Sequence, residues 1–373
     1  MKKKLGLIVN PIAGMGGRVG LKGSDGIEIL KLAMDRGAEP ESPARTSVAL
    51  SKIVMLKDQI EILTFPYNMG HHESAHLGFH TTIIGNTSEY ETTPKDTEVA
   101  ARRMLELGVD MILFAGGDGT ARNIHDVIGT KVPVLGIPAG VKIHSGVYAT
   151  SPANAGDMAC KFLEGSQRVL LKEAEVMDID EEAFRNDRLS AQLYGYMRIP
   201  YERSLVQSAK AGSVSGEEVS MDAIASEVIN TMEENCNYII GPGTTTRAIM
   251  DKLNLKNSLL GVDVICNKKL IASDLNENEL LELVKDKEAK IIVTIIGGQG
   301  YIFGRGNQQI SHRVINGVGK ENIIVIANQS KLLALKGSPL MVDTGNEETN
   351  LKLCGYTKVI TGLGKYMAYK VIC

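Results

Sequence analysis

The amino-acid sequence predicts an α/β fold with an N-terminal doubly wound parallel sheet and a second, mixed α/β domain. Two observations point to this fold. Short continuous apolar runs alternate with helical patterns over residues 1–145, which is typical of parallel strands that are buried on both faces. Glycine-rich turns follow several of these runs, at the position where open α/β sheets bind their ligands.

The elements of the first domain follow from apolar runs and glycine stops. Thr97 fits the N-cap or first turn of a helix that Gly108 ends, and a second helix is predicted over 120–128. This order of strands and helices is that of a Rossmann-like domain. The predicted strands lie within residues 4–10, 60–65, 110–115 and 132–140.

The pattern changes beyond residue 151. The stretch "RLSAQLYGYMRIPY" (188–201) alternates like a half-exposed strand, and "SGEEVSMDAIASEVINTMEEN" (215–235) is typical of an amphipathic helix. We predict domains at 1–150 and 151–335, and a C-terminal segment, 336–373, that packs back on either domain. Further strands are predicted in "CNYII" (236–240), "LLGVDVI" (259–265), "AKIIVTII" (289–296) and "NIIVIAN" (322–328).

The composition limits the classes of function that the sequence supports. The 373 residues include 43% apolar and 23% charged residues, with a formal net charge of -3, so electrostatics favours neither a nucleic acid nor a membrane as partner. The opening "MKKKLGLIVN" has too short an apolar run for a signal peptide, and no run approaches the roughly 18 residues of a membrane span. The five cysteines are far apart and form no CxxC pair, which favours a cytoplasmic protein without a disulfide framework.

One carboxylate stands inside a glycine turn, in "ILFAGGDGTARNI" (112–124). Glycines let a backbone approach a phosphate, and a helix start binds anions. We therefore predict that Gly116, Gly117, Gly119 and Thr120 cradle a phosphate. Asp118 would repel phosphate, so it fits if Mg²⁺ intervenes or if it accepts the proton of a substrate hydroxyl. The alternative is that Asp-Gly is ordinary turn chemistry and Asp118 a helix N-cap.

A second glycine turn, "IIGPGTTTRAI" (239–249), has the same order of strand, turn and helix. Its residues suit a second anion or acceptor site, since hydroxyls and arginine bind phosphate; a threonine-capped helix is the alternative. The residues concerned are Gly241, Gly243, Thr244, Thr245, Thr246 and Arg247.

Other polar clusters have weaker patterns. Lys142 follows the glycine turn at Gly140 and either reaches a phosphate or is solvated. His72, His76 and His80 share one helical face, but Gly78 weakens that helix, so surface histidines are favoured over a metal site. The amide-rich loop 304–311 is suited to binding a nucleobase or ribose, and a merely polar loop is the favoured interpretation.

The sequence resembles the superfamily of NAD kinases and diacylglycerol kinases, whose signature is Gly-Gly-Asp-Gly-Thr after a buried strand. "VNPIAG" (9–14), with Asn10, is similar to the turn that ends the first strand in lipid kinases. "VPVLGIPAG" (132–140) resembles the strand and turn after the signature, and "GPGTTTRA" (241–248) loosely resembles a dinucleotide-binding segment of NAD kinases. Over most of its length the chain is similar to the ATP-NAD kinase-like branch associated with acetoin catabolism.

The resemblance implies phosphorylation of the 2′-hydroxyl of the adenosine ribose of NAD by ATP with Mg²⁺, or by polyphosphate, to give NADP. Asp118 would be the catalytic residue, Asn10, Gly140 and Lys142 would join the phosphate cradle, and 244–246 would lie near the dinucleotide. The active site would lie in a cleft between the domains, whose closure excludes water. Relatives are commonly homo-oligomers.

Some residues depart from the family pattern. The Asn-Glu pair that grips the acceptor nucleoside has its nearest counterpart at Asn186 and Asp187, with different flanking residues, and Asn123 stands where lipid kinases often have an acid. Two alternatives to a small-molecule kinase therefore stay open: a regulatory protein that binds nucleotides or sugar phosphates without turnover, and a lipid kinase.

Overall fold

The computed structural model of the chain divides into two compact units, which are Met1–Met15 with Gly23–Ala209 and Gly16–Lys22 with Lys210–Cys373. The domain limits predicted from the sequence lie elsewhere, at residues 150 and 335. The first unit continues past residue 150 to Ala209, and residues 336–373 belong to the second unit. The structure describes residues 2–21, 27–89, 92–140, 143–179, 191–202, 217–258, 260–285, 287–296, 300–304, 306–335 and 337–373.

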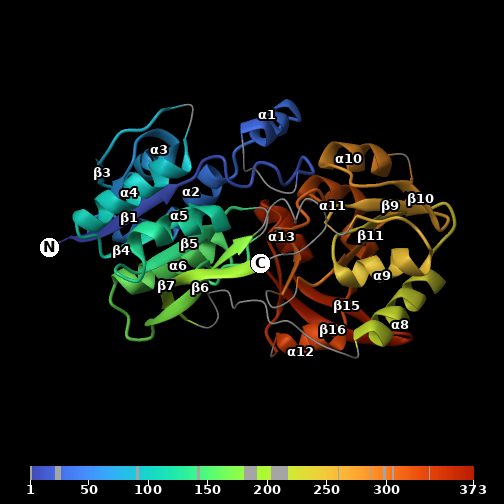
Figure 1. Cartoon of the computed structure of the whole chain (residues 1–373). Coiled ribbons are helices and arrows are strands. Elements are labelled where there is room, and N and C mark those ends of the chain that lie inside the picture. Colours follow the sequence, from blue (N-terminus) through green and yellow to red (C-terminus); the bar gives the residue numbers. More distant parts are fainter. Residues whose placement is uncertain are drawn as a thin grey trace. The chain divides into compact units, whose positions relative to one another are not determined.

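The first unit is built on a five-stranded sheet with the order β3-β2-β1-β4-β5 (Figure 1). Every pairing in it is parallel, for example Leu5 with Met111. Two longer strands, β6 and β7, form a separate antiparallel pair. The strands are β1 (Lys3–Val9), β2 (Ile60–Thr64), β3 (Thr81–Ile83), β4 (Met111–Gly116), β5 (Val134–Pro138), β6 (Leu170–Ile179) and β7 (Ala191–Tyr201).

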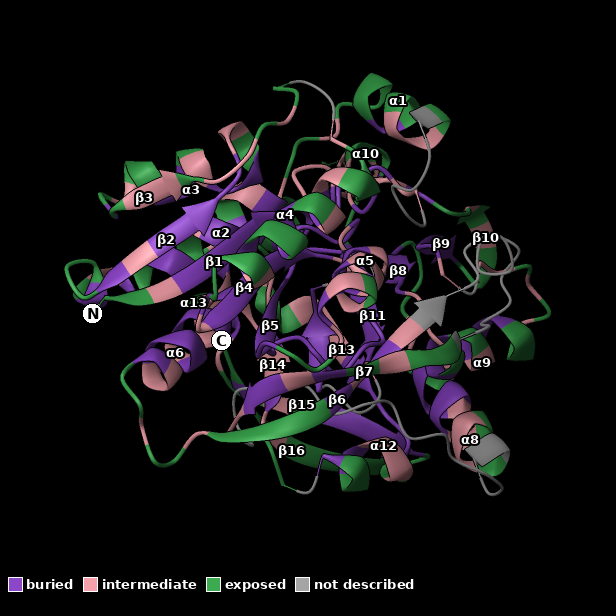
Figure 2. Ribbon diagram, turned by 60° about the vertical axis from the view of Figure 1, so that its left-hand side comes forward, coloured by how far each residue is buried: buried purple, intermediate pink, exposed green. Residues whose placement is uncertain are grey.

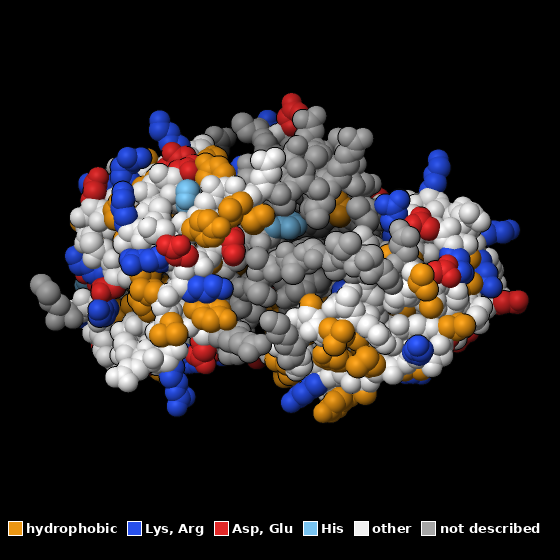
Figure 3. Space-filling model, turned by 60° about the horizontal axis from the view of Figure 1, so that its bottom comes forward, with side chains coloured by type: hydrophobic (Ala, Val, Ile, Leu, Met, Phe, Trp, Pro, Cys, Tyr) orange, Lys and Arg blue, Asp and Glu red, His pale blue; other side chains and the backbone are white. Residues whose placement is uncertain are grey.

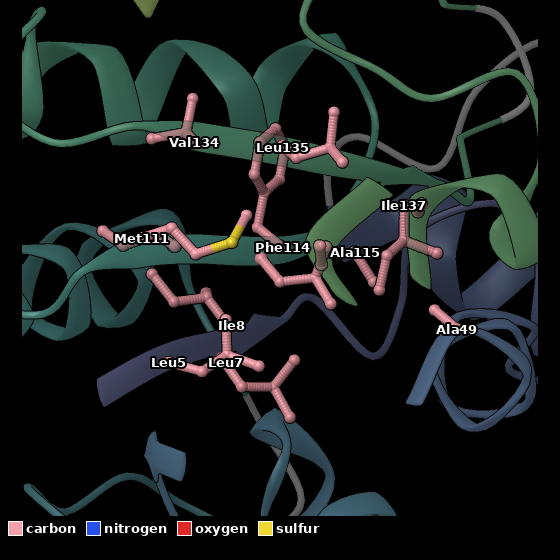
Figure 4. Close-up of a cluster of buried hydrophobic side chains, with 14 of the residues drawn as sticks. Leu5, Leu7, Ile8, Ala49, Met111, Phe114, Ala115, Val134, Leu135 and Ile137 are labelled. Carbon is pink, nitrogen blue, oxygen red and sulfur yellow. The ribbon is translucent and has the colours of Figure 1, made fainter. Parts of the chain in front are cut away.

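Central strands of this sheet are buried along their whole length, because helices cover both faces. All residues of β4 and β5 are buried (Figure 2). Phe114, Val134 and Leu135 lie in one cluster with Leu5 and Leu7 of β1 (Figure 4). Continuous burial explains why these strands appear in the sequence as unbroken apolar runs.

Among the described residues, six α-helices accompany the first sheet. The α4 helix packs against α5, whereas α2 packs against α3 and α6. Thr97 lies in the first turn of α4, and the N-cap is Thr93, which forms a capping box with Asp96 in which the Thr93 N–H donates to Asp96 Oδ2 over 2.8 Å. The helices are α1 (Ile27–Asp35), α2 (Ser42–Ser51), α3 (His71–His76), α4 (Pro94–Glu106), α5 (Asp118–Ile128) and α6 (Pro152–Leu163).

The second unit contains a mixed nine-stranded sheet with the order β10-β9-β8-β11-β13-β15-β16-β14-β12. Strands β8, β11, β13 and β15 run parallel, while β15 and β16 form an antiparallel hairpin. The strands are β8 (Asn237–Ile240), β9 (Asp263–Cys266), β10 (Lys269–Ala272), β11 (Ala289–Thr294), β12 (Tyr301–Phe303), β13 (Ile323–Ile326), β14 (Leu340–Val342), β15 (Gly355–Gly362) and β16 (Lys365–Ile372).

The central strands of the second sheet are buried on both faces, whereas β10 and much of β16 are exposed. Ile239 and Ile291 lie in one apolar cluster, and their neighbours Ile240 and Ile292 lie in the other. The two clusters separate because successive residues of a strand point to opposite faces. The helices are α8 (Glu217–Asn230), α9 (Thr244–Lys252), α10 (Glu277–Lys285), α11 (His312–Val318), α12 (Gln329–Ala334) and α13 (Glu347–Leu353).

These two units confirm the predicted α/β fold, a Rossmann-like sheet together with a mixed α/β second part. Within the described residues no helix is long and apolar enough to cross a membrane. Charged side chains of both signs are interspersed on the face shown in Figure 3.

Candidate functional site

The carboxyl ends of β1, β4 and β5 meet at one edge of the first sheet. Asn10 follows β1 and donates its N–H to the Ala115 carbonyl at the end of β4 over 2.9 Å. Gly140 follows β5 and donates its N–H to the Gly116 carbonyl over 2.9 Å. This edge is where an open parallel sheet binds its ligands.

Glycine is required here by close contact between two turns. A Cβ at Gly140 would lie 2.7 Å from the Gly117 Cα atom, so a side chain at residue 140 would displace the turn after β4. A Cβ at Gly116 would lie 2.4 Å from the hydroxyl oxygen of Thr120. Packing alone therefore explains part of the glycine pattern that the sequence analysis assigned to phosphate binding.

Helix α5 begins in the middle of the signature. Gly117 occupies the N-cap position and has no side chain with which to cap the helix, so Asp118 is the first helical residue and the alternative that it is the N-cap is wrong. The first N–H groups of a helix lack intrahelical acceptors and attract anions. Asn10 Nδ2 donates to the Thr120 hydroxyl over 3.1 Å. The structure thus brings Asn10 and Thr120 together beside the amide groups predicted to bind phosphate.

The carboxylate of Asp118 is buried and oriented by backbone. Its Oδ2 accepts the His144 N–H over 2.8 Å, and its Oδ1 accepts the Ser145 N–H over 3.0 Å. The ring nitrogen Nδ1 of His144 lies 3.5 Å from Oδ2. Asp118 therefore holds the segment after the Gly140 turn in place, a structural role that the spacing in the sequence did not indicate.

This arrangement leaves Asp118 able to contact a substrate. A carboxylate offers about four lone-pair sites, and two of them accept the N–H groups of His144 and Ser145. Across the residues that the structure describes, no group of three or more His, Cys, Asp or Glu side chains could hold a metal ion.

A matching edge exists in the second unit, where β8, β11 and β13 end. The Gly241 N–H donates to the Ile292 carbonyl over 2.9 Å, which holds the turn against β11. Gly243 has a φ of 137° and serves as N-cap of α9, a conformation that favours glycine. Thr245 and Thr246 are buried in the first turn of the helix, and Thr246 Oγ1 donates to the Gly243 carbonyl.

A lysine that the sequence analysis missed faces this turn. Lys331 Nζ donates to Thr245 Oγ1 over 2.9 Å and to Thr294 Oγ1 over 3.3 Å. Thr294 ends β11, and Lys331 lies in α12, whose N-cap is Asn328. An ammonium group beside a helix N-terminus favours an anionic ligand. Lys331 lies in "ANQSK" (327–331), which follows a buried strand. Many strands are followed by polar residues of this kind, so the sequence does not predict a role for Lys331 until the strand order is known.

Arg247 occupies a different position from the other residues of the second turn. It lies on the exposed side of α9, and its Nε is 3.4 Å from an Asp251 carboxylate oxygen one turn later. The exposed Thr244 begins the helix. The buried pair Thr245 and Thr246 therefore shapes the turn, while Arg247 forms an ion pair along its own helix.

Several predicted features lie outside the described residues, namely Lys142, Asn186 and Asp187. Helix α3 covers only His71–His76, so His80 is not on one helical face with His72 and His76. Asn307 in the amide-rich loop donates to the Ile302 carbonyl and accepts the Gly304 N–H, so its side chain is used to shape the loop.

Comparison with protein families gives two matches. Residues 5–167 match the ATP-NAD kinase N-terminal domain, and residues 233–371 match the ATP-NAD kinase C-terminal domain. Together the two matched ranges span most of the chain. No curated protein sequence matches it.

Two solved structures, each named as a "putative diacylglycerol kinase" from Bacillus anthracis str. Sterne, are similar to parts of the chain. The first has 16% identity and a TM-score of 0.27, over 48% of this chain and 46% of its own. The second has 12% identity and a TM-score of 0.27, over 64% of this chain and 58% of its own. The chain thus spans about half the length of these structures.

Proposed function

The chain belongs to the ATP-NAD kinase family, and we propose that it transfers a phosphoryl group from ATP to the 2′-hydroxyl of the adenosine ribose of NAD, or to an alcohol of a related nucleotide. The observation that carries this proposal is the buried Asp118 at the first position of α5, oriented by the N–H groups of His144 and Ser145. A carboxylate fixed beside an anion-binding helix end suits a reaction in which a hydroxyl meets a phosphate.

In this proposal the loop after β4 binds ATP. The first amide groups of α5 and the Thr120 hydroxyl, steadied by Asn10, would bind phosphate oxygens. Bound Mg²⁺ would neutralise charge on the β- and γ-phosphates. Phosphoryl transfer depends mostly on positioning and on stabilisation of charge, and both follow from rigid groups such as these.

Asp118 would orient the acceptor hydroxyl and accept its proton. Its two hydrogen bonds to backbone fix the carboxylate, and its remaining lone pairs can accept the hydroxyl proton. For the second unit taken by itself, the turn at Gly241–Gly243 with Lys331 would bind an anionic group, such as a pyrophosphate, through the ammonium group and the start of α9.

The test is NADP formation from Mg-ATP and NAD, measured by coupling to an NADP-specific dehydrogenase. Asp118→Asn keeps the size of the side chain but only one of its two acceptors for the backbone N–H groups, so its folding is checked by circular dichroism. It is purified in the same way and controls for contaminating kinases. We expect NADP from the native protein and turnover reduced by about 10²–10⁴ in the variant, with nucleotide binding retained. Equal turnover in the variant would mean that the signal does not depend on Asp118, whether it comes from a contaminating kinase or from this chain.

The same assay separates the alternatives. If ADP is released when another alcohol replaces NAD, including a lipid alcohol in vesicles, the chain is a kinase with a different acceptor. A regulatory protein that binds nucleotides without turnover is the other candidate. NAD binding without ADP release, whichever acceptor is present, would establish that function instead.

A further inference from the structure

Two cysteines outside the candidate site lie against each other in the second unit. Cys354 directly follows α13 and precedes β15, and Cys373 follows β16. Gly355 pairs with Val371 in the hairpin, so the two cysteines flank its open end. Their Sγ atoms are 2.9 Å apart.

We propose that Cys354 and Cys373 are a modification site, at which a low-molecular-weight disulfide oxidises the two thiols to a reversible intramolecular disulfide. The separation of the sulfur atoms supports this directly, because a disulfide needs cysteines whose backbones already lie close together. The antiparallel register between β15 and β16 supplies that closeness without any rearrangement of the sheet.

The two thiols differ in their exposure to solvent. Cys373 is exposed, and Cys354 is partly buried. Burial, with a smaller contribution from the hydrogen bond to Cys373, raises the pKa of the Cys354 thiol to about 11. A thiol with a raised pKa is rarely a thiolate, which is the reacting species. Cys373 is therefore the thiol that reacts first with an oxidant from solution.

The reaction is two successive exchanges. The Cys373 thiolate attacks one sulfur of the small disulfide, a mixed disulfide forms at Cys373, and one small thiolate leaves. Cys354 then loses its proton and attacks the Cys373 sulfur, which releases the second small thiolate and forms the bond between Cys354 and Cys373. Two protein thiols are oxidised, and one small disulfide is reduced to two thiols.

The remaining cysteines provide an internal comparison. Cys160, Cys236 and Cys266 are all buried, and burial raises the pKa of Cys160 and of Cys236. Buried thiols of this kind are inert toward solution oxidants. Oxidation is therefore expected at the hairpin pair alone.

The disulfide would restrain the open end of the hairpin within the sheet. Strand β16 pairs with β15 on one side and, through Val371 and Ile372, with β14 on the other. Strand β14 in turn pairs with β12. A disulfide at the open end of the hairpin closes a loop over a separation of 19 residues, and loops of that size restrict the unfolded chain substantially. Oxidation should therefore raise the thermal unfolding midpoint by several degrees.

In the experiment, the reduced chain is incubated in buffers with a series of ratios of oxidised to reduced glutathione. The reaction is stopped with acid, free thiols are alkylated, and the products are analysed by intact mass and peptide mapping. We expect a mass lower by two hydrogen atoms, a cross-linked peptide pair containing Cys354 and Cys373, and full reversal by reduced glutathione. Cys354→Ser should instead accumulate a glutathione adduct on Cys373, while Cys160→Ser should oxidise like the native chain.

Two results would overturn the proposal. One is a lasting glutathione adduct on Cys373 of the native chain without the cross-link, because the thiols would then not meet. The other is a native chain that stays reduced in the most oxidising buffer. The peptide map of the native chain decides between these outcomes even if a serine variant folds poorly, and neither result depends on kinase activity.

Discussion

The two glycine turns at sheet edges differ in the charge that each presents. The turn after β4 contains the buried carboxylate of Asp118, which accepts two backbone N–H groups. The turn after β8 contains only hydroxyls and backbone, and an ammonium group from Lys331 reaches it. The two turns have a similar order of glycines and threonines, yet one is organised around an anion and the other around a cation.

This difference teaches that a glycine turn does not by itself define an anion site. At the first turn the contact between backbones requires glycine at residue 140, since a Cβ atom there would lie 2.7 Å from the Gly117 Cα atom. At the second turn the positive φ of Gly243 is what requires glycine. Four substitutions test the comparison, described from the largest expected effect to the smallest.

The largest effect on stability is expected from Asp118→Ala. It leaves the buried N–H groups of His144 and Ser145 without their acceptor, which should cost about 2–4 kcal/mol in the free energy of unfolding. Denaturant unfolding measures the loss. Asp126→Ala, an exposed residue of the same helix that accepts one hydrogen bond from Tyr194, should cost less than about 1 kcal/mol. Equal losses in both variants would contradict the structural role of Asp118.

A second test places a methyl group between the turns of the first unit. In Gly140→Ala the new Cβ would lie 2.7 Å from the Gly117 Cα atom, and such overpacking typically costs about 1–3 kcal/mol. Gly317→Ala is the matched control, because its Cβ meets only Val284 Cγ2 at an ordinary 3.5 Å within a helix. Thermal unfolding should be lowered by the first substitution and unchanged or raised by the second; the reverse order would rule out the close contact.

A third test removes the cation of the second turn. Lys331→Met keeps the length of the apolar chain and deletes the ammonium group that contacts Thr245 and Thr294. If the turn binds an anionic part of the acceptor, KM for that acceptor should rise about tenfold, or roughly 1.4 kcal/mol, with little change in kcat. Lys352→Met, at an exposed lysine paired with Glu348, should leave KM unchanged. An unchanged KM in Lys331→Met would remove the turn from acceptor binding.

The smallest effect concerns a buried carboxylate without the support that Asp118 has. Burial raises the pKa of Glu73, and among the described residues none donates a hydrogen bond to its Oε2. A folded-state pKa above the unfolded value of 4.5 means that the folded chain holds this proton more tightly. The resulting stability is present below pH 4.5 and is lost as pH rises through the folded-state pKa.

Glu73→Gln cannot ionise, so it should lose less stability than the native chain between pH 4.5 and 8. Its free energy of unfolding at pH 8 should therefore exceed the native value. Denaturant unfolding at a series of pH values measures both slopes. Parallel curves for the two proteins would show that Glu73 does not titrate differently in the folded chain.

Much of the fold follows from local pattern. The strands β1, β4, β5, β8, β11 and β13 coincide with apolar runs, because strands covered on both faces need apolar residues at every position. The helix in 215–235 and the one after the signature were likewise predictable from periodicity and a glycine stop. The exact start of α4 was not, since Thr97 fitted either the N-cap or the first turn, and the capping box of Thr93 and Asp96 settles it.

The candidate site was predictable only in part. Asn10, Gly116, Gly117, Thr120 and Gly140 come together as parallel strands require, and the roles predicted for them, as for Gly119 in the same turn, stay predictions. The contacts of Asp118 with His144 and Ser145 span 26 and 27 residues. Lys331 is separated from Thr245 by 86 residues. A local sequence pattern cannot predict contacts between residues so far apart in the chain.

The sequence by itself determined the α/β class, the strands, and the acid at the turn before α5, because burial and glycine conformation act on neighbouring residues. The tertiary structure alone decided which groups meet at each sheet edge: the backbone that holds Asp118, the lysine beside Thr245, and the cysteines at the open end of the hairpin. The reason is that strand order and register, which bring distant residues within hydrogen-bond distance, depend on the packing of the whole sheet.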